Sequence, residues 1–381
     1  MKRLISLLLS IMILSSFSSI VSINAYAAKI ISGDYTYKTD GNGEATILSY
    51  NGKDFDVEIP EELDGHKVTK IADEAFVESD YNYLDKSYIS VIRTVTIPST
   101  IEKISPYNFY SLPYINNIFV DKDNKNYTAD KGVLFNKDKT KLINYPTARL
   151  GSSYTVPKSV KTIGAVAFYG CKYLKSVELT NKVKSIQGMA FFDCREISGI
   201  YVPKSVKKIG NYAFGCKKEY STGWYNPSID DEFWDASEQL DTVISPLQGF
   251  VLYGEKNSTA QKYCKKSETD FFDNKADRVV FKAVSIKKPK LKAKGEKGKL
   301  SISFSWNKNI TEFELHFVKG KKKWNQSYAV LGAESVKGSM FSTSFKKMKK
   351  GTYKIKIRTR MNFGGHYVYT PWSKTVSVKI G

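Results

Sequence analysis

The sequence predicts a β-rich chain of two parts: a repeat solenoid with a parallel sheet on one face and short helices or turns on the other, followed by an all-β sandwich. Three observations support this fold class. Apolar residues between Tyr154 and Cys216 recur every 23 positions, apolar and polar residues alternate singly after residue 285, and the net charge of +21 lies almost entirely in that last part. The 381 residues are enough for two or three domains.

The repeat is defined by four apolar columns. They contain Val156, Leu179 and Val202; Val160, Val183 and Val206; Ile163, Ile186 and Ile209; and Phe168, Phe191 and Phe214. A single amphipathic helix cannot keep one spacing of 23 residues in four columns. Stacked coils can, because each coil buries its apolar face only when a neighbouring coil covers it.

The consensus of these units, roughly V-x-I/V-P-x-S-V-x-x-I-G-x-x-A-F-x-x-C, resembles the leucine-rich repeat of the BspA-like (Treponema pallidum-type) bacterial surface proteins. The resemblance covers most of residues 55–284. It implies a leucine-rich-repeat solenoid and a bacterial surface protein that binds other proteins, as adhesins of this family do.

Residues 1–27 are expected to be a signal peptide. Lys2 and Arg3 precede an apolar run that ends at Ile23, and Ala25 and Ala27 supply the small residues at which a signal peptidase cuts. An uncleaved anchor is the alternative, because the run is long enough to cross a bilayer, but its seven serines disfavour it. We therefore expect a secreted, extracellular protein without membrane contact after cleavage, either free or associated with the cell surface.

Residues 28–54 are expected to cap the first coil, because two alternating segments flank the turn signal Asp40–Gly43. The coils follow over residues 55–284. In a longer unit at 112–150, the segments Asp130–Gly132 and Asn136–Asp138 punctuate the apolar pairs Val133-Leu134 and Leu142-Ile143, which predicts a small hairpin packed on the coil. An insertion at 217–248 breaks the period.

The insertion carries a candidate binding loop. Trp224, Tyr225 and Trp234 stand in an acidic stretch of it. A loop of this kind can fold its aromatic residues back onto the coils, as surface insertions commonly do. It can also offer them to a sugar ring or to a protein.

The cysteines are expected to be buried free thiols. Cys171, Cys194 and Cys216 occupy the same place in successive coils, where a small apolar side chain is required, and Cys264 lies in a helix-like segment. Disulfides are the alternative in a secreted chain. A ladder of three parallel side chains meets the required torsion poorly and cannot pair evenly.

Residues 285–381 are expected to form a basic sandwich domain. They contain 23 Lys and Arg against four Glu, a net charge of +19, whereas residues 29–284 are neutral with 34 of each sign. The layout resembles a fibronectin type III domain in its early Trp306, in the strand Gly351–Arg358 and in Trp372-Ser373. This resemblance implies that Tyr353 occupies the tyrosine-corner position.

No catalytic arrangement is evident. His66, His316 and His366 are dispersed, and there is no G-x-S-x-G, C-x-x-C, HExxH or phosphate loop. Acidic residues at Asp121, Asp123 and Asp130 lack the spacing of a calcium loop. We expect a protein that is not an enzyme and has no cofactor or metal.

Two candidate binding surfaces follow from the register. Residues that point away from the coil core form a candidate binding face, and cations of the basic domain form a candidate polyanion patch. The face contains Thr96, Phe119, Thr155, Glu178 and Tyr201. The patch contains Lys321, Lys322 and Lys323 in an expected turn and Lys354, Lys356, Arg358 and Arg360 along one strand.

The favoured hypothesis is a non-catalytic, adhesin-like binding protein. Its solenoid would bind a host or neighbouring-cell protein, and its basic domain would retain it on an anionic cell-wall polymer or acidic glycan. The alternative is a carbohydrate-binding module for acidic glycans, and a third hypothesis is an accessory part of a hydrolase. We expect a monomer that binds no specific nucleic-acid sequence.

Overall fold

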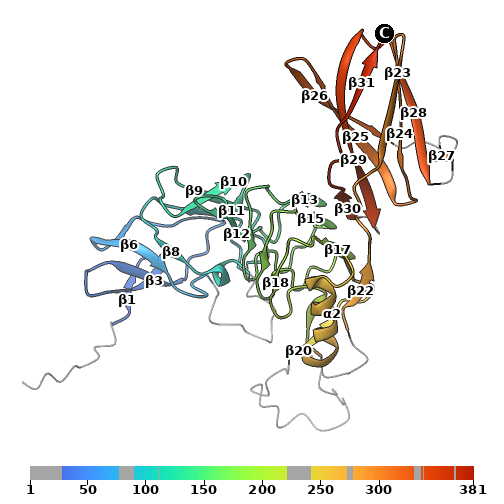
Figure 1. Cartoon of the computed structure of the whole chain (residues 1–381). Helices are drawn as coiled ribbons and strands as arrows, with labels where there is room; N and C mark the ends of the chain where they lie inside the picture. Colours follow the sequence, from blue (N-terminus) through green and yellow to red (C-terminus); the bar gives the residue numbers. More distant parts are fainter. Residues whose placement is uncertain are drawn as a thin grey trace, which may run out of the picture.

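The computed structural model describes residues 28–76, 90–110, 112–220, 242–272, 278–329, 336–337, 339–363 and 366–381. Strands predominate over helices in the described residues, which confirms the β-rich class; the helices among them are η1 (Pro106–Asn108) and α2 (Thr259–Asp270) (Figure 1). Within these residues no helix has the length and apolar character to cross a bilayer. The expected signal peptide lies outside them, as do Trp224, Tyr225 and Trp234.

An antiparallel sheet leads into the first coil. It contains β1 (Ile30–Ser32), β2 (Tyr35–Thr39) and β3 (Ala45–Tyr50). Asp40 forms the β2–β3 turn, because its Oδ1 accepts hydrogen bonds from the amides of Asn42 (2.9 Å) and Glu44 (3.2 Å). β3 then pairs in parallel with β6 (His66–Ile71), which also pairs with β5 (Glu62–Leu63) and β8 (Lys103–Ile104). The sequence predicted this hairpin between residues 28 and 54.

Parallel strands of successive coils form one row along the repeat region. Its three sheets are β4 (Asp56–Glu58), β7 (Thr94–Ile97) and β9 (Asn117–Val120); β13 (Ser153–Thr155) and β15 (Ser176–Glu178); and β17 (Gly199–Val202), β21 (Val251–Gly254) and β22 (Val280–Ala283). Val95 lies opposite Ile118, and Tyr154 lies opposite Val177. The pairing thus follows the 23-residue spacing of the sequence.

A second row of strands lies on another side of the coils. It contains β10 (Tyr127–Asp130), β11 (Val133–Asn136), β12 (Lys141–Asn144), β14 (Thr162–Ile163), β16 (Ser185–Ile186) and β18 (Lys208–Ile209). β11 and β12 are antiparallel and form the hairpin expected in the longer unit, and β10 adds a further antiparallel strand beside β11. Ile163, Ile186 and Ile209 are consecutive partners in the parallel part.

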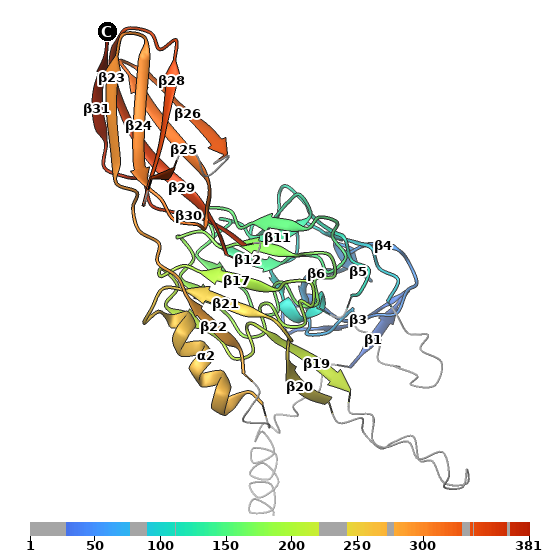
Figure 2. The ribbon, with the colours of Figure 1, turned by 90° about the vertical axis from the view of Figure 1, so that its right-hand side faces the viewer.

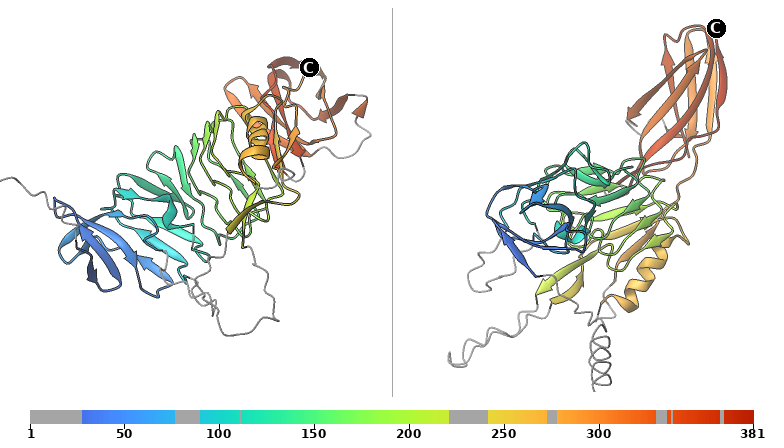
Figure 3. Two further views of the ribbon diagram at one scale, coloured as in Figure 1. Left: turned by 90° about the horizontal axis from the view of Figure 1, so that it is seen from below. Right: turned by 90° about the vertical axis from the view of Figure 1, so that its left-hand side faces the viewer.

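The phenylalanine column shows how the coils stack. The ring centroids of Phe168 and Phe191 are 4.6 Å apart with an interplanar angle of 8°, and those of Phe191 and Phe214 are 5.0 Å apart at 12°. All three side chains are buried. The coils lie one behind another in Figure 3 (left), and each covers the apolar side of its neighbour.

The last coils are closed by a hairpin and a helix. β19 (Cys216–Tyr220) pairs antiparallel with β20 (Thr242–Pro246), and α2 packs Tyr263 and Cys264 onto the same core as the phenylalanines. The four cysteines are free and buried, as expected from their places in the coils. Burial raises the pKa of Cys171 and brings those of Cys216 and Cys264 to about 12.

Residues 291–380 form two antiparallel sheets around one core (Figure 2). One sheet contains β23 (Leu291–Glu296), β24 (Lys299–Ser305), β28 (Met340–Lys346) and β27 (Val336–Lys337). The other contains β26 (Lys322–Ala329), β25 (Ile310–Lys319), β29 (Gly351–Phe363), β30 (His366–Tyr369) and β31 (Val376–Ile380). The Tyr353 hydroxyl donates to the carbonyl of Lys349 at 2.7 Å, which is the contact that a tyrosine corner makes.

An apolar joint connects the two parts. Tyr201 and Tyr253 of the coils pack with Ile310, Met361 and Phe363 of the C-terminal domain. The Phe363 ring centroid is 6.4 Å from that of Tyr201 and 5.9 Å from that of Tyr253. The C-terminal domain therefore stands on the outer face of the last coils, and its far end carries the C-terminus (Figure 1).

Candidate binding surfaces

Thr96 and Phe119 lie side by side on the first outer sheet. They are direct partners in the β7–β9 pairing, and Glu58 is the partner of Thr96 on its other side. Phe119 is 50% exposed, which is a large fraction for an aromatic side chain. Three successive coils therefore present one acidic, one hydroxyl and one aromatic side chain to solvent, as the register predicted.

Thr155 and Glu178 form a second pair, on the β13–β15 sheet. The Thr155 hydroxyl donates to Glu178 Oε2 at 3.3 Å. This pair does not continue the sheet of Phe119. The amide of Ile118 donates to the carbonyl of Gly132 (3.0 Å), so the turn of the β10–β11 hairpin takes the place beside β9. The predicted face is thus divided by the inserted unit.

Tyr201 differs from the expectation of an exposed residue. It points away from the coil core, as the register required, but it is only 7% exposed because Phe363 covers it. Burial raises the pKa of its hydroxyl, and the Glu255 carboxylate adds to the effect. The open part of the face therefore ends before β17. Tyr201 packs in the apolar joint with the C-terminal domain instead.

An exposed edge that the register analysis missed borders the open face. Tyr114, Leu150 and Tyr173 each stand three residues before the first residue of β9, β13 and β15, and they are 45%, 80% and 48% exposed. Backbone hydrogen bonds join these coils, from Ala148 to Ile115 and from Lys175 to Ser152. We call this row of three side chains the exposed edge. Aligning each coil by its strand would have revealed Tyr114 and Tyr173, whereas the longer unit hides Leu150.

Cations flank the exposed edge. Lys172 Nζ lies 4.9 Å from the ring centroid of Tyr114, and the Arg93 guanidinium lies 4.4 Å from that of Phe55, which directly precedes β4. Cations at this distance are attracted to the ring face. Large apolar side chains exposed on neighbouring coils beside cations are typical of a protein-interaction surface.

The candidate polyanion patch divides into two groups. Lys354, Lys356, Arg358 and Arg360 do share one face of β29, but the two arginines are already neutralised there. Arg358 lies 2.5 Å from Glu314 Oε2, and Arg360 lies 3.1 Å from Glu312 Oε1. By contrast, Lys321, Lys322, Lys323 and Lys354 are exposed.

The cations of β29 also contact aromatic rings. The Arg358 guanidinium lies 4.1 Å from the Tyr369 ring centroid, and Lys356 Nζ lies 4.9 Å from that of Trp372. Burial raises the pKa of Tyr369, and Arg360 and Arg358 oppose this shift. On this face the acids, the arginines and the rings contact one another.

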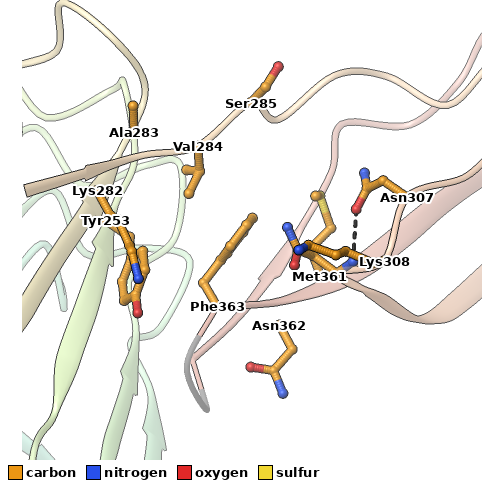
Figure 4. A pocket seen from close by; sticks show the side chains of 11 residues that line it. Tyr253, Lys282, Ala283, Val284, Ser285, Asn307, Lys308, Met361, Asn362 and Phe363 are labelled. Carbon is orange, nitrogen blue, oxygen red and sulfur yellow. Dashed lines mark hydrogen bonds between the residues drawn. The ribbon is translucent and has the colours of Figure 1, made fainter.

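A cavity of about 580 Å³ lies at the joint (Figure 4). Tyr253 and Phe363 form its apolar side, and Lys282, Lys308 and Asn307 add polar groups. Asn307 Oδ1 accepts a hydrogen bond from the amide of Asn309 at 2.9 Å, which holds the loop beside it. Within the described residues no group of three His, Cys, Asp or Glu side chains could hold a metal ion.

The repeat region is similar to a known family of repeats. Residues 58–149 and 148–226 match the model of the BspA type leucine rich repeat region, in six copies. Among solved structures, a leucine-rich repeat protein from Eubacterium ventriosum is 22% identical, with a TM-score of 0.34; the match covers 48% of this chain and 68% of that one. A leucine rich cell surface protein from Faecalibacterium prausnitzii is 21% identical, with a TM-score of 0.33, and the match covers 49% and 52%.

The Treponema pallidum leucine rich repeat protein is 20% identical, with a TM-score of 0.25 and coverage of 49% and 66%. A search of the curated proteins finds no match. The family match spans fewer than half of the residues of the chain and ends before the C-terminal domain. Residues 58–226 are accordingly similar to the BspA type leucine rich repeat region.

Proposed function

We propose that the chain is a non-catalytic binding protein of a bacterial cell surface or extracellular space. Its leucine-rich-repeat solenoid binds a host or neighbouring-cell protein, and its basic, fibronectin III-like domain retains it on an anionic polymer. The observation that carries this proposal is the exposed edge of Tyr114, Leu150 and Tyr173 beside an open sheet face. Surface rows of large apolar side chains are rare in chains without a binding partner.

Binding energy in protein interfaces concentrates in a few large side chains, and tyrosine is prominent among them. The exposed edge supplies two tyrosines and one leucine on rigid coils, so little conformational freedom is lost when a partner orders them. The adjacent Phe119 extends the apolar contact onto the sheet.

The experiment is a pull-down with the mature full-length chain against host extracellular proteins, compared with a Tyr114→Ser, Leu150→Ser, Tyr173→Ser variant. The proposal predicts a protein that the wild type captures and the variant does not. The matched control replaces three exposed polar residues, Lys125→Ser, Asp138→Ser and Lys182→Ser. Equal capture by the edge variant would contradict the proposal.

Binding of an acidic glycan is a second candidate function. The joint cavity favours it, because two aromatic rings and the side chains of Lys282 and Lys308 line it, a combination that suits a sugar with a negative charge. A glycan array with Lys308→Ala, and with Trp224→Ala and Trp234→Ala in the loop, tests it. Absence of binding, or binding that none of these changes alters, excludes the glycan function.

A further inference from the structure

Three turns of the C-terminal domain meet at the end farthest from the coils, where Figure 1 marks the C-terminus. They are the turns between β23 and β24, between β25 and β26, and between β28 and β29. The amide of Met348 donates to the carbonyl of Gly298 (3.0 Å), and Lys319 Nζ donates to the carbonyl of Lys350 (2.8 Å). These hydrogen bonds hold the three turns together.

The turns bring together cations that are distant in the sequence. We call them the lysine tip: Lys297, Lys321, Lys322, Lys323, Lys346, Lys347, Lys349 and Lys350, all exposed. Lys319 is excluded because its ammonium group is held by backbone carbonyls and lies 4.9 Å from the ring centroid of Tyr353. Gly351 makes this possible: it has a φ of 144°, and a Cβ there would lie 2.7 Å from Lys319 Cε.

The tip is not neutralised locally. Glu296 is the one acidic side chain in these three turns, and it is engaged by Lys294 at 3.1 Å and Lys299 at 4.0 Å. Within the described part of the chain, none of the eight tip lysines forms an ion pair. The arginines of β29, in contrast, each have a glutamate partner.

We propose that the lysine tip, and not the face of β29, binds a flexible linear polymer that carries a phosphate in every backbone unit, and that it does so by charge density alone. This inference rests on the proposed retention of the chain by an anionic polymer and assigns the site and the ligand class. Lysine ammonium groups act on phosphate as point charges, whereas planar bidentate recognition of a carboxylate requires arginine, which the tip lacks.

The end-on position has a geometric consequence. The polymer is held at one extremity of the molecule, and the open sheet face and the exposed edge lie on the other part (Figure 1). Binding at the tip therefore leaves the repeat region free for a protein partner.

The test measures the affinity of the mature full-length chain for long-chain inorganic polyphosphate as a function of salt concentration. The tip variant replaces Lys321, Lys322, Lys323, Lys349 and Lys350 with Gln. Each lysine that no longer neutralises a phosphate reduces the magnitude of the slope of log K against log salt by about 0.7, so the five changes reduce it by about 3.5 and lower the affinity by a hundredfold or more at low salt. Exposed lysine changes of this kind leave folding nearly unaffected.

The matched control removes five charges from exposed positions outside the tip, with Gln at Lys265, Lys287, Lys288, Lys290 and Lys374. We expect its affinity to stay within about threefold of wild type, because the screening length at 0.1 M salt is only about 10 Å. Equal losses of polyphosphate affinity in both variants would show that the tip is not the binding site, but the proposal that an anionic polymer retains the chain would still stand. A wild-type chain that does not bind polyphosphate at all would overturn retention itself.

A third arm separates binding through backbone phosphate charge from binding through base stacking. Trp324 is partly exposed near the tip, with its ring 5.1 Å from that of Phe317, and bases gain affinity by stacking on such rings. Binding by charge density predicts that Trp324→Ala leaves the affinities for polyphosphate and for a single-stranded thymidine oligonucleotide unchanged. A tenfold preference for the oligonucleotide that Trp324→Ala abolishes would show that bases stack on this ring and would overturn binding by charge density alone.

Discussion

Phe191 has a neighbouring ring on each side, at 4.6 Å and 5.0 Å between centroids, and it is buried. Such a residue is shared by three coils, so its removal affects more than its own repeat. Phe119 also lies on a coil, but it faces solvent. These two phenylalanines distinguish the packing role of the repeat from its surface role.

Phe191→Ala should lower the free energy of unfolding by about 3–5 kcal/mol, because it removes a large buried side chain and leaves a cavity between two rings. Phe119→Ala should change it by less than about 0.5 kcal/mol. Urea unfolding followed by circular dichroism measures both. Comparable effects of the two substitutions would contradict the stacked column.

The thiols provide a test that depends on pH. Burial raises the pKa of Cys216 and Cys264 to about 12, so these groups stay protonated in the folded chain at pH 8–9. Since their folded pKa exceeds the unfolded value, their contribution to stability is complete below the usual thiol pKa and is lost as the pH rises toward 12.

Ellman's reagent at pH 8 should therefore label none of the four cysteines in the native chain and all four in urea. Rapid labelling of native wild type, absent in Cys216→Ala or Cys264→Ala, would show that the helix α2 region is open to solvent.

At the scale of elements, the pairing of β25 with β29 determines which charged side chains lie opposite one another on the outer face. Glu314 is opposite Arg358, and Glu312 is opposite Arg360. The side chain of Glu314 is 9% exposed and that of Glu312 is 34% exposed. Ion pairs that water reaches contribute little, whereas a buried charge that loses its partner is costly.

Glu314→Gln should therefore destabilise the C-terminal domain by about 1–3 kcal/mol, because Arg358 keeps its charge in a half-buried place. Glu312→Gln should cost less than about 1 kcal/mol. Chemical unfolding at low salt measures the difference. A larger effect at Glu312 than at Glu314 would contradict this account of the face.

The sequence predicts elements well where they repeat or alternate. The columns that end in Phe168, Phe191 and Phe214 place the coils, because every coil solves the same packing problem with the same residues. Alternation over Tyr353–Arg360 gives the inward and outward faces of β29. It does not give the partner of Arg358, because Glu314 reaches it only through the pairing of strands that are 44 residues apart.

At the scale of the whole molecule, the joint decides which part of the coil face stays open. Tyr201 follows the periodic pattern of an outward residue, yet Phe363, more than 150 residues later, covers it. No local pattern reports such an interaction. The division of the face at Gly132 is likewise not visible in a local pattern. It depends on how the inserted hairpin folds back beside β9.

Phe363→Ala should loosen the joint, because it removes the ring that packs against both Tyr201 and Tyr253. We expect small-angle X-ray scattering to show a more extended and more variable chain, while Leu150→Ala, away from the joint, leaves the curve unchanged. Superimposable curves for wild type and Phe363→Ala would show that this ring does not fix the C-terminal domain.

The separation of the two binding surfaces is tested most directly by a crossed binding measurement on the full chain. Wild type, the exposed-edge variant and the lysine-tip variant are each titrated with the captured protein partner and with polyphosphate. The account predicts that the edge variant loses the partner and keeps polyphosphate, and that the tip variant does the reverse. A variant that loses both ligands, or partner binding that follows the charge of the tip, would contradict it.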